Sequence, residues 1–208
     1  ADYLKAYAPD FTAFRSGGLL PVRQPDWATV LPVNWKSVRD VDNEGYHVPM
    51  AHPGLQDLYG RTYRDLTLTD GTSLSLGYFG DVPGRLWSVK NYAKLAPPAP
   101  HLPQHLQKAW TYYGLWPNAV FSFTPEVFQF YQELPIGPGQ TRVTGRIYRR
   151  PNETRAQRVA RYLAYRIDRE TSAEDQQLSI WSNESMRSSA FDNFHLSDLE
   201  WGLRRHHD

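Results

Sequence analysis

The 208-residue chain contains no cysteine, which excludes disulfides, zinc–thiolate sites and iron–sulfur clusters held by this chain. It also lacks an apolar run long enough to span a bilayer. Its formal charge of +1 gives no reason to expect nucleic acid or an anionic membrane as a partner. The first residues contain neither an initiator Met nor a signal peptide. We therefore expect a fragment or a processed product of a cytoplasmic enzyme.

What the sequence does contain is the composition of one globular domain. Hydrophobic residues make up 40% of the chain and charged residues 22%, and the length suits a single sizeable core. The seven Trp, thirteen Tyr and nine Phe can fill that core or line an apolar pocket. The proline-rich residues 96–103 are expected to form a stiff loop between two halves of the domain.

The hydrophobic pattern predicts an α+β domain with an antiparallel sheet. Helices are expected at residues 34–47, 55–60, 103–114 and, as one long C-terminal helix, 154–186. Strands are expected at residues 85–92, 119–123, 127–134 and 141–148, and in a hairpin over residues 63–79. The hairpin turn is predicted at Asp70-Gly71. We expect the long helix to pack across the curved sheet.

Two histidines that stand five residues apart, His47 and His52, are the most informative feature of the chain. On an ideal helix, five steps of about 100° place them about 140° apart, on different faces. Pro49 interrupts the segment, so a helix ending near His47 could turn and bring His52 beside it. Two neutral imidazoles can bind Zn, Fe, Cu or Ni. Glu44, three residues before His47, could orient the first of these ligands.

The residues around the two histidines resemble the iron-binding motif of the α subunits of Rieske-type ring-hydroxylating oxygenases. The motif consists of an acidic residue, one further residue, Tyr-His, four residues and then His-Pro. It is present here as Glu44-Gly45-Tyr46-His47-Val48-Pro49-Met50-Ala51-His52-Pro53. The resemblance extends from about residue 34 to the C-terminus. It includes Asn34-Trp35-Lys36, residues 116–123, residues 134–139 and Ala173-Glu174-Asp175-Gln176.

This resemblance implies a helix-grip (SRPBCC/Bet v1-like) fold, an antiparallel sheet wrapped by a long C-terminal helix. It also implies one mononuclear Fe(II) held by His47, His52 and Asp175. Without the histidine motif, Asp175 would be interpreted as a solvated charge on a helix. The alternatives for the third ligand are Glu174, Asp168 and Glu184.

Glu44 matches the acidic residue that, in this family, bridges to the electron-donating cluster of a neighbouring subunit, although many relatives carry Asp there. That [2Fe–2S] Rieske cluster needs two Cys and two His. We therefore expect the cluster on a missing domain or on another chain, with residues 1–33 as a lead-in segment and residues 34–208 as the catalytic domain. The expected partners are an organic substrate, O2, a reductase or ferredoxin, and further subunits in a homotrimer or an α3β3 assembly.

The predicted activity is hydroxylation or dihydroxylation of an aromatic or other small organic substrate. A quaternary ammonium monooxygenase or demethylase is the alternative within the family, because an aromatic-rich pocket also accepts a cation. Two alternatives from other classes are a non-catalytic helix-grip ligand-binding domain and a zinc hydrolase with Glu44 as its base. The candidates for pocket-lining side chains are Met50, Trp116, Phe121, Phe123, Phe128 and Phe130.

Overall fold

The computed structural model describes residues 5, 7–67, 73–80 and 83–207. Within these ranges, seven strands form one antiparallel sheet in the order β1-β7-β6-β5-β4-β3-β2. The strands are β1 (Leu20–Leu31), β2 (Arg64–Thr67), β3 (Ser73–Tyr78), β4 (Ala109–Leu115), β5 (Ala119–Phe123), β6 (Val127–Gly137) and β7 (Gln140–Arg149). Residues 20–31, which belong to the expected lead-in segment, thus form an edge strand of the sheet paired with β7.

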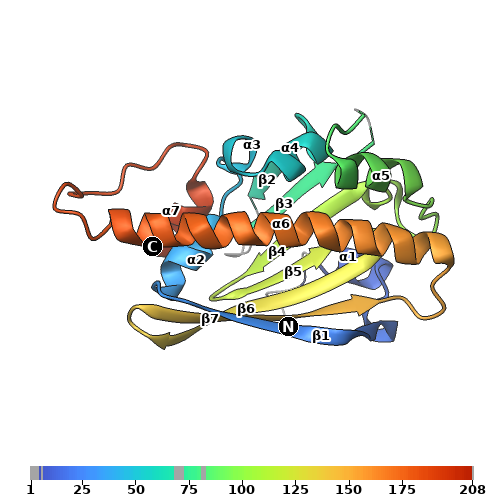
Figure 1. The fold of residues 1–208 in the computed structure, drawn as a ribbon, viewed down its shortest axis with the longest axis horizontal. Helices are drawn as coiled ribbons and strands as arrows, with labels where there is room; N and C mark the ends of the chain where they lie inside the picture. The colour runs from blue at the N-terminus through green and yellow to red at the C-terminus, as the bar shows by residue number, and fades with distance from the viewer. Residues whose placement is uncertain (1–4, 6, 68–72, 81–82, 208) are drawn as a thin grey trace.

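The helices cover both faces of this sheet. They are α1 (Ala8–Ala13), α2 (Trp35–Asp42), α3 (Val48–Ala51), α4 (Pro53–Tyr59), α5 (Trp87–Leu95), α6 (Arg155–Ser185) and α7 (Trp201–His207). Two 3-10 turns, η2 (Ser16–Gly18) and η3 (Gln104–Leu106), complete the regular structure. Figure 1 shows α6 crossing one face of the sheet, with α3, α4 and α5 beside it and α1 on the far side. This arrangement confirms the predicted α+β helix-grip fold.

The long helix α6 follows directly from local sequence. Thr154 and Gln157 form a capping box at its N-terminus, each side chain bonding the other residue's backbone N–H. Its 31 residues extend about 46 Å, enough to cross the whole sheet. The buried stripe is apolar at Leu163 and Ile167 but polar at Ser179 and Asn183. The second half of the helix therefore faces an interior that is not purely hydrophobic.

No helix in the described part of the chain is long and apolar enough to cross a membrane.

Alternation along the strands gives the sheet two differently packed faces. On the face covered by α6, Trp110 of β4 packs with Tyr59, Tyr92 and Ile167. On the opposite face, Tyr113, Phe121, Phe123, Phe128 and Phe130 pack with Tyr7, Phe11 and Phe14 from the N-terminal region. The molecule thus has an aromatic core on one side of the sheet and a mixed core beneath α6.

Two of the predicted elements were wrong. Residues 85–92, expected to be a strand, contribute instead to α5, whose buried residues Ser88, Val89 and Tyr92 have helical spacing. Residues 103–114, expected to be a helix, form η3 and most of β4. Six of the seven residues of β4 are buried, so this strand shows no alternation that would distinguish it from a helix. The antiparallel pairing of β2 with β3 agrees with the predicted hairpin, but the Asp70-Gly71 turn lies outside the described residues.

Candidate metal centre

A short helix places the two histidines side by side. His47 caps the N-terminus of α3, and His52 lies at the junction where α3 ends and α4 begins. Proline lies in the first turn of each helix, where its missing N–H is not needed by the helix. The backbone of His52 (φ −119°, ψ 83°) is not helical, so the chain changes direction there. The helix expected to end near His47 ends instead at Asp42, and Pro49 lies in the first turn of α3 rather than ending a helix. The change of direction lies at His52, and it brings both imidazoles to one side.

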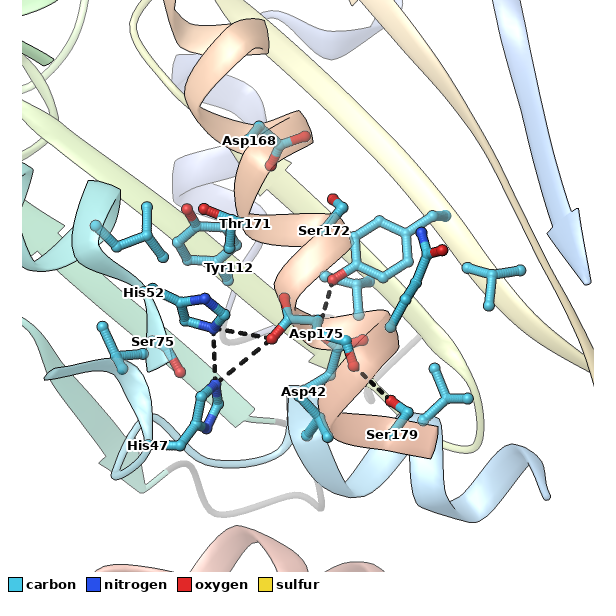
Figure 2. A pocket seen from close by; sticks show the side chains of 18 of the residues that line it. Asp42, His47, His52, Ser75, Tyr112, Asp168, Thr171, Ser172, Asp175 and Ser179 are labelled. Atoms are coloured by element: carbon cyan, nitrogen blue, oxygen red, sulfur yellow. Dashed lines mark hydrogen bonds and ion pairs between the residues drawn. The ribbon is translucent and has the colours of Figure 1, made fainter. Parts of the chain in front are cut away.

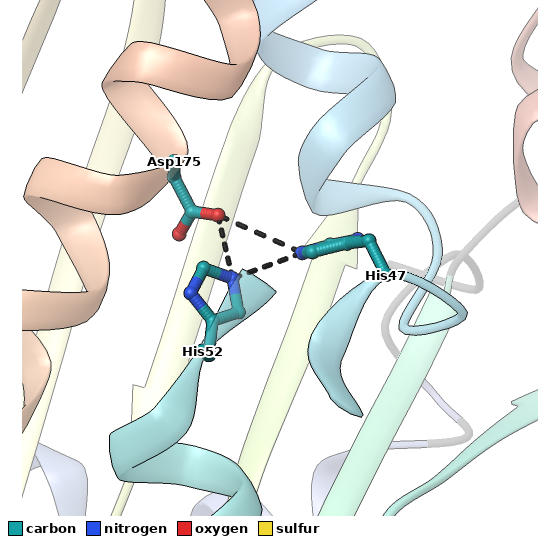
Figure 3. Close-up of side chains that lie close together, drawn as sticks. All are labelled: His47, His52 and Asp175. Atoms are coloured by element: carbon teal, nitrogen blue, oxygen red, sulfur yellow. Dashed lines mark hydrogen bonds and ion pairs between the residues drawn. The ribbon is translucent and has the colours of Figure 1, made fainter. Parts of the chain in front are cut away.

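Asp175 of α6 completes a cluster with the two rings (Figure 3). The Nε2 atoms of His47 and His52 are 3.0 Å apart. Asp175 Oδ1 lies 2.8 Å from Nε2 of His52 and 3.6 Å from Nε2 of His47. The three side chains can thus offer one ligand atom each to a common metal ion. The structure brings together the three residues that the resemblance singled out, one of them more than 120 positions away in the sequence.

Each imidazole is held from behind by a second carboxylate. The Nδ1 atom of His47 hydrogen-bonds Glu44 Oε1, and the backbone N–H of His47 donates to Glu44 Oε2 at 3.1 Å. The Nδ1 atom of His52 lies 2.8 Å from Glu174 Oε2. A carboxylate beside each Nδ1 favours a proton on that atom, so each Nε2 is the ring atom that can bind a metal.

The three residues considered as alternatives to Asp175 lie at different places relative to the cluster. Glu174 orients His52 from behind, a role the sequence analysis did not assign to it. Asp168 lines the cavity beside the cluster, and Glu184 is exposed near the C-terminus of α6. The orienting role of Glu174 was hidden because a carboxylate beside Asp175 looks like an ordinary helix charge in sequence.

The cluster has the chemistry of a cation site. Asp175 Oδ1 is buried and accepts no well-formed hydrogen bond from any described group. Burial lowers the pKa of His47, but the nearby carboxylates of Asp175 and Glu44 outweigh it and raise that pKa to about 10. Burial alone would raise the pKa of Asp175, yet the two facing imidazoles lower it. The cluster thus favours a positive charge between its three side chains, which a proton or a metal ion can supply. Two imidazoles with one carboxylate are a donor set that suits Fe(II).

A cavity of about 110 Å³ opens beside the cluster, under the second half of α6 (Figure 2). Its wall combines Trp27, Tyr63, Tyr112 and Tyr131 with aliphatic side chains and with the carboxylates Asp42, Glu44, Asp168 and Asp175. Neither Lys nor Arg lines it in the part of the chain that the structure describes. The cavity is thus aromatic and acidic at once.

None of the six candidates for pocket-lining side chains lines this cavity. Phe121, Phe123, Phe128 and Phe130 pack on the other face of the sheet. Met50 and Trp116 are 90% and 63% exposed. Strand alternation correctly separates the two faces of a strand, but it does not say which face borders the cavity.

A buried charged layer that sequence reasoning missed lies next to the cavity. The Tyr131 hydroxyl donates to Asp42 Oδ1 at 2.9 Å, and burial, with Glu133 nearby, raises the pKa of Asp42 well above its usual range. Glu133 is fully buried and lies 3.7 Å from Arg39, which is 2% exposed. On β6, Glu133 lies on the same face of the sheet as Gln129 and Tyr131. Strand alternation could therefore have predicted that Glu133 points inward.

Comparisons with known proteins identify the family of the chain. Residues 21–208 match the family described as the ring-hydroxylating alpha subunit (catalytic domain). The chain therefore belongs to this family of Rieske oxygenase catalytic domains. No curated protein matches the sequence.

Several solved structures share the fold. A quaternary ammonium Rieske monooxygenase, described for carnitine oxidation by gut microbiota, matches with a TM-score of 0.73 and 18% identity, covering 99% of this chain and 54% of its own. The monooxygenase CntA with its substrate L-carnitine matches with a TM-score of 0.65 and 19% identity, covering 99% and 52%. Naphthalene 1,2-dioxygenase from Rhodococcus sp., bound to indole, has a TM-score of 0.62 and 13% identity, covering 99% and 59%. The chain thus spans between half and three fifths of these relatives.

Proposed function

We propose that this chain is the iron-bearing catalytic domain of an oxygenase that uses Fe(II) and O2 to hydroxylate or dihydroxylate a small organic substrate. One observation carries the proposal. The Nε2 atoms of His47 and His52 and Asp175 Oδ1 converge on one point, with the far side of each ring fixed by a carboxylate. The substrate cavity adjoins that point, as oxygen transfer at the metal requires.

The proposed role of the three central residues is to hold the metal. Bound Fe(II) would supply a centre that activates O2, since three protein ligands leave coordination positions free. His52 is 1% exposed, so bulk water does not reach its ring. Glu44 and Glu174 would fix the orientation of the two rings and the proton on each Nδ1.

Glu44 has a second proposed role at the point of electron entry. It is 10% exposed and contacts His47 through both of its oxygens. A carboxylate bonded to the ring of a metal ligand offers a short electron path from outside the domain. The [2Fe–2S] cluster at the other end of that path would belong to a preceding domain or another chain, since these 208 residues contain no cysteine.

The remaining proposals concern the complete assembly. We propose a reductase or ferredoxin as the source of electrons, and a homotrimer or α3β3 arrangement in which they cross between subunits. Residues 34–208 would hold the catalytic site, and residues 1–33 would connect it to the cluster domain. Residues 20–31 have a further structural role in this scheme, because they complete the sheet.

The alternatives from other classes receive less support. A non-catalytic ligand-binding domain has no use for two imidazole Nε2 atoms directed at a buried carboxylate. A zinc hydrolase needs a base aimed at the metal-bound water, but Glu44 has both oxygens engaged with His47 on the far side of that ring. Within the family, the acidic wall of the cavity favours a quaternary ammonium substrate, such as the L-carnitine bound by the monooxygenase CntA.

Iron uptake tests the proposal. We expect anaerobically reconstituted protein to bind one Fe(II) per chain, and His47→Ala, His52→Ala and Asp175→Ala to lose it. His195→Ala and Glu184→Gln are matched controls, because both residues are exposed and outside the cluster. Oxygen consumption with a separate Rieske donor and reductase then tests the reaction. Absence of iron in the wild type, or full occupancy in His47→Ala, would overturn the proposal.

A further inference from the structure

The cavity wall contains two carboxylates that the proposed iron site leaves unused, Asp42 and Asp168, and Asp42 already accepts a hydrogen bond from the Tyr131 hydroxyl. Asp168 lies seven residues before Asp175 on α6, and seven steps of about 100° return to nearly the same face of a helix. Both residues line the cavity, about two helical turns apart (Figure 2). Asp175 belongs to the metal cluster, so Asp168 remains as a separate negative group in the wall.

Asp168 is charged at neutral pH, and no cation accompanies it. Burial raises the pKa of Asp168 to about 6, with a further contribution from Asp175 and an opposing one from Gln129. The carboxyl therefore loses its proton well below pH 7.5. None of the charged groups that shift this pKa is a cation, and no Lys or Arg of the described chain reaches the cavity wall. Asp168 is half-buried and its hydrogen-bond partner is the neutral side chain of Gln129, so the carboxylate has no counter-charge. A charge held away from water without a counter-charge is unfavourable, and a positively charged ligand would relieve that cost.

The neighbouring side chains suit an organic cation. Tyr112 is close enough for the charge of Asp168 to contribute to the raised pKa of its hydroxyl. The rings of Trp27, Tyr63 and Tyr131 line the same cavity. The face of an aromatic ring attracts a cation, and this attraction strengthens when water is removed. A neutral hydrocarbon would fill the same space but would leave the carboxylate without a counter-charge.

We infer that Asp168 selects a substrate that carries an organic ammonium group, seated between this carboxylate and the aromatic wall of the cavity. The inference rests on the proposed oxygenase function and narrows it to one substrate class. Asp168 is a specificity-determining residue in this view, and His47, His52 and Asp175 would hold the metal that supplies the oxygenation chemistry beside the same ligand.

A pair of isosteric probes tests this inference. Choline and 3,3-dimethylbutan-1-ol have nearly the same shape, but only choline is charged. Calorimetric titration of Fe(II)-loaded protein at pH 7.5 should show choline binding at least about tenfold more tightly than the alcohol. Asp168→Asn and Asp168→Ser should each weaken choline about tenfold or more and leave the alcohol unchanged. Glu170→Gln, two positions away on an exposed part of α6, should change neither.

The outcomes are distinct from those that test the iron site. Equal binding of both probes to the wild type, or a preference for choline that survives in both Asp168 variants, would overturn the inference. Circular dichroism and Fe(II) stoichiometry on the same samples show whether a variant is folded and loaded. Wild-type protein that binds no iron but prefers choline through Asp168 would refute the oxygenase proposal and leave the cation site standing.

Discussion

Replacing Glu174 with Gln tests how the chain orients its second histidine. Glu174 Oε2 accepts a hydrogen bond from Nδ1 of His52 at 2.8 Å, and His52 is almost completely buried. Gln has nearly the same shape, but it carries no charge and only one acceptor oxygen. The variant therefore weakens the partner of Nδ1 without removing the side chain from α6. We expect Fe(II) to bind less tightly because His52 becomes a less basic and less fixed ligand.

The size of the effect follows from burial. Changing the outer partner of a ligating histidine generally weakens metal binding by about 10- to 100-fold. Glu174 is 36% exposed, so water screens its charge, and we expect a loss of about tenfold, or about 1.4 kcal/mol. Glu44 is only 10% exposed and contacts both Nδ1 and the backbone N–H of His47. Glu44→Gln should therefore lose more, toward about 100-fold.

Anaerobic competition with a chromophoric Fe(II) chelator measures these affinities. Glu184→Gln, exposed and farther along the same helix, is the matched control and should bind iron like the wild type. The reasoning is refuted if Glu174→Gln also binds like the wild type. It is equally refuted if Glu174→Gln loses more Fe(II) affinity than Glu44→Gln, because the more buried carboxylate would then contribute less to metal binding.

Three further predictions concern stability and the helices. Ile167 is 1% exposed in the core beneath α6, so Ile167→Ala should lower the free energy of unfolding in urea by about 2–5 kcal/mol, and no loss would contradict its place there. A Cβ on Gly202 would lie 2.0 Å from the carbonyl oxygen of Asn43, so Gly202→Ala should release α7 and speed its amide hydrogen exchange; unchanged exchange would contradict this packing. Asp168 has a folded pKa of about 6 against an ordinary 3.8, so its ionisation destabilises the fold increasingly as pH rises between these values and fully above them. Asp168→Asn should therefore raise the unfolding free energy at pH 7.5, by at most about 3 kcal/mol, but not at pH 3; a gain that is equal at both pH values would contradict this.

Local sequence was sufficient for the long helix and for most of the sheet. The capping box at Thr154 and the glycine turn between β6 and β7 are short-range signals, and both correspond to observed element ends. The segment from His47 to His52 was only partly readable, because the first helix ends at Asp42 and Pro49 begins a new helical turn instead of ending one. The resemblance to a known motif then pointed to Asp175 as their partner on α6.

The rest depended on tertiary placement that no local pattern records. β4 is buried on both faces, so its sequence does not alternate, and α5 is too short for its period to be decisive. Glu174 and Asp168 look like solvated helix charges until the sheet is placed beneath α6. The aromatic strand residues remained candidates for the pocket because alternation identifies two faces without saying that α1 covers one and the cavity borders the other.

Diffraction at the iron absorption edge, from crystals of anaerobically Fe(II)-loaded protein, tests the central claim most directly. The account predicts a single anomalous peak per chain, bounded by Nε2 of His47, Nε2 of His52 and Oδ1 of Asp175. A peak at another group of side chains, or no peak in protein that retains its fold, would contradict it.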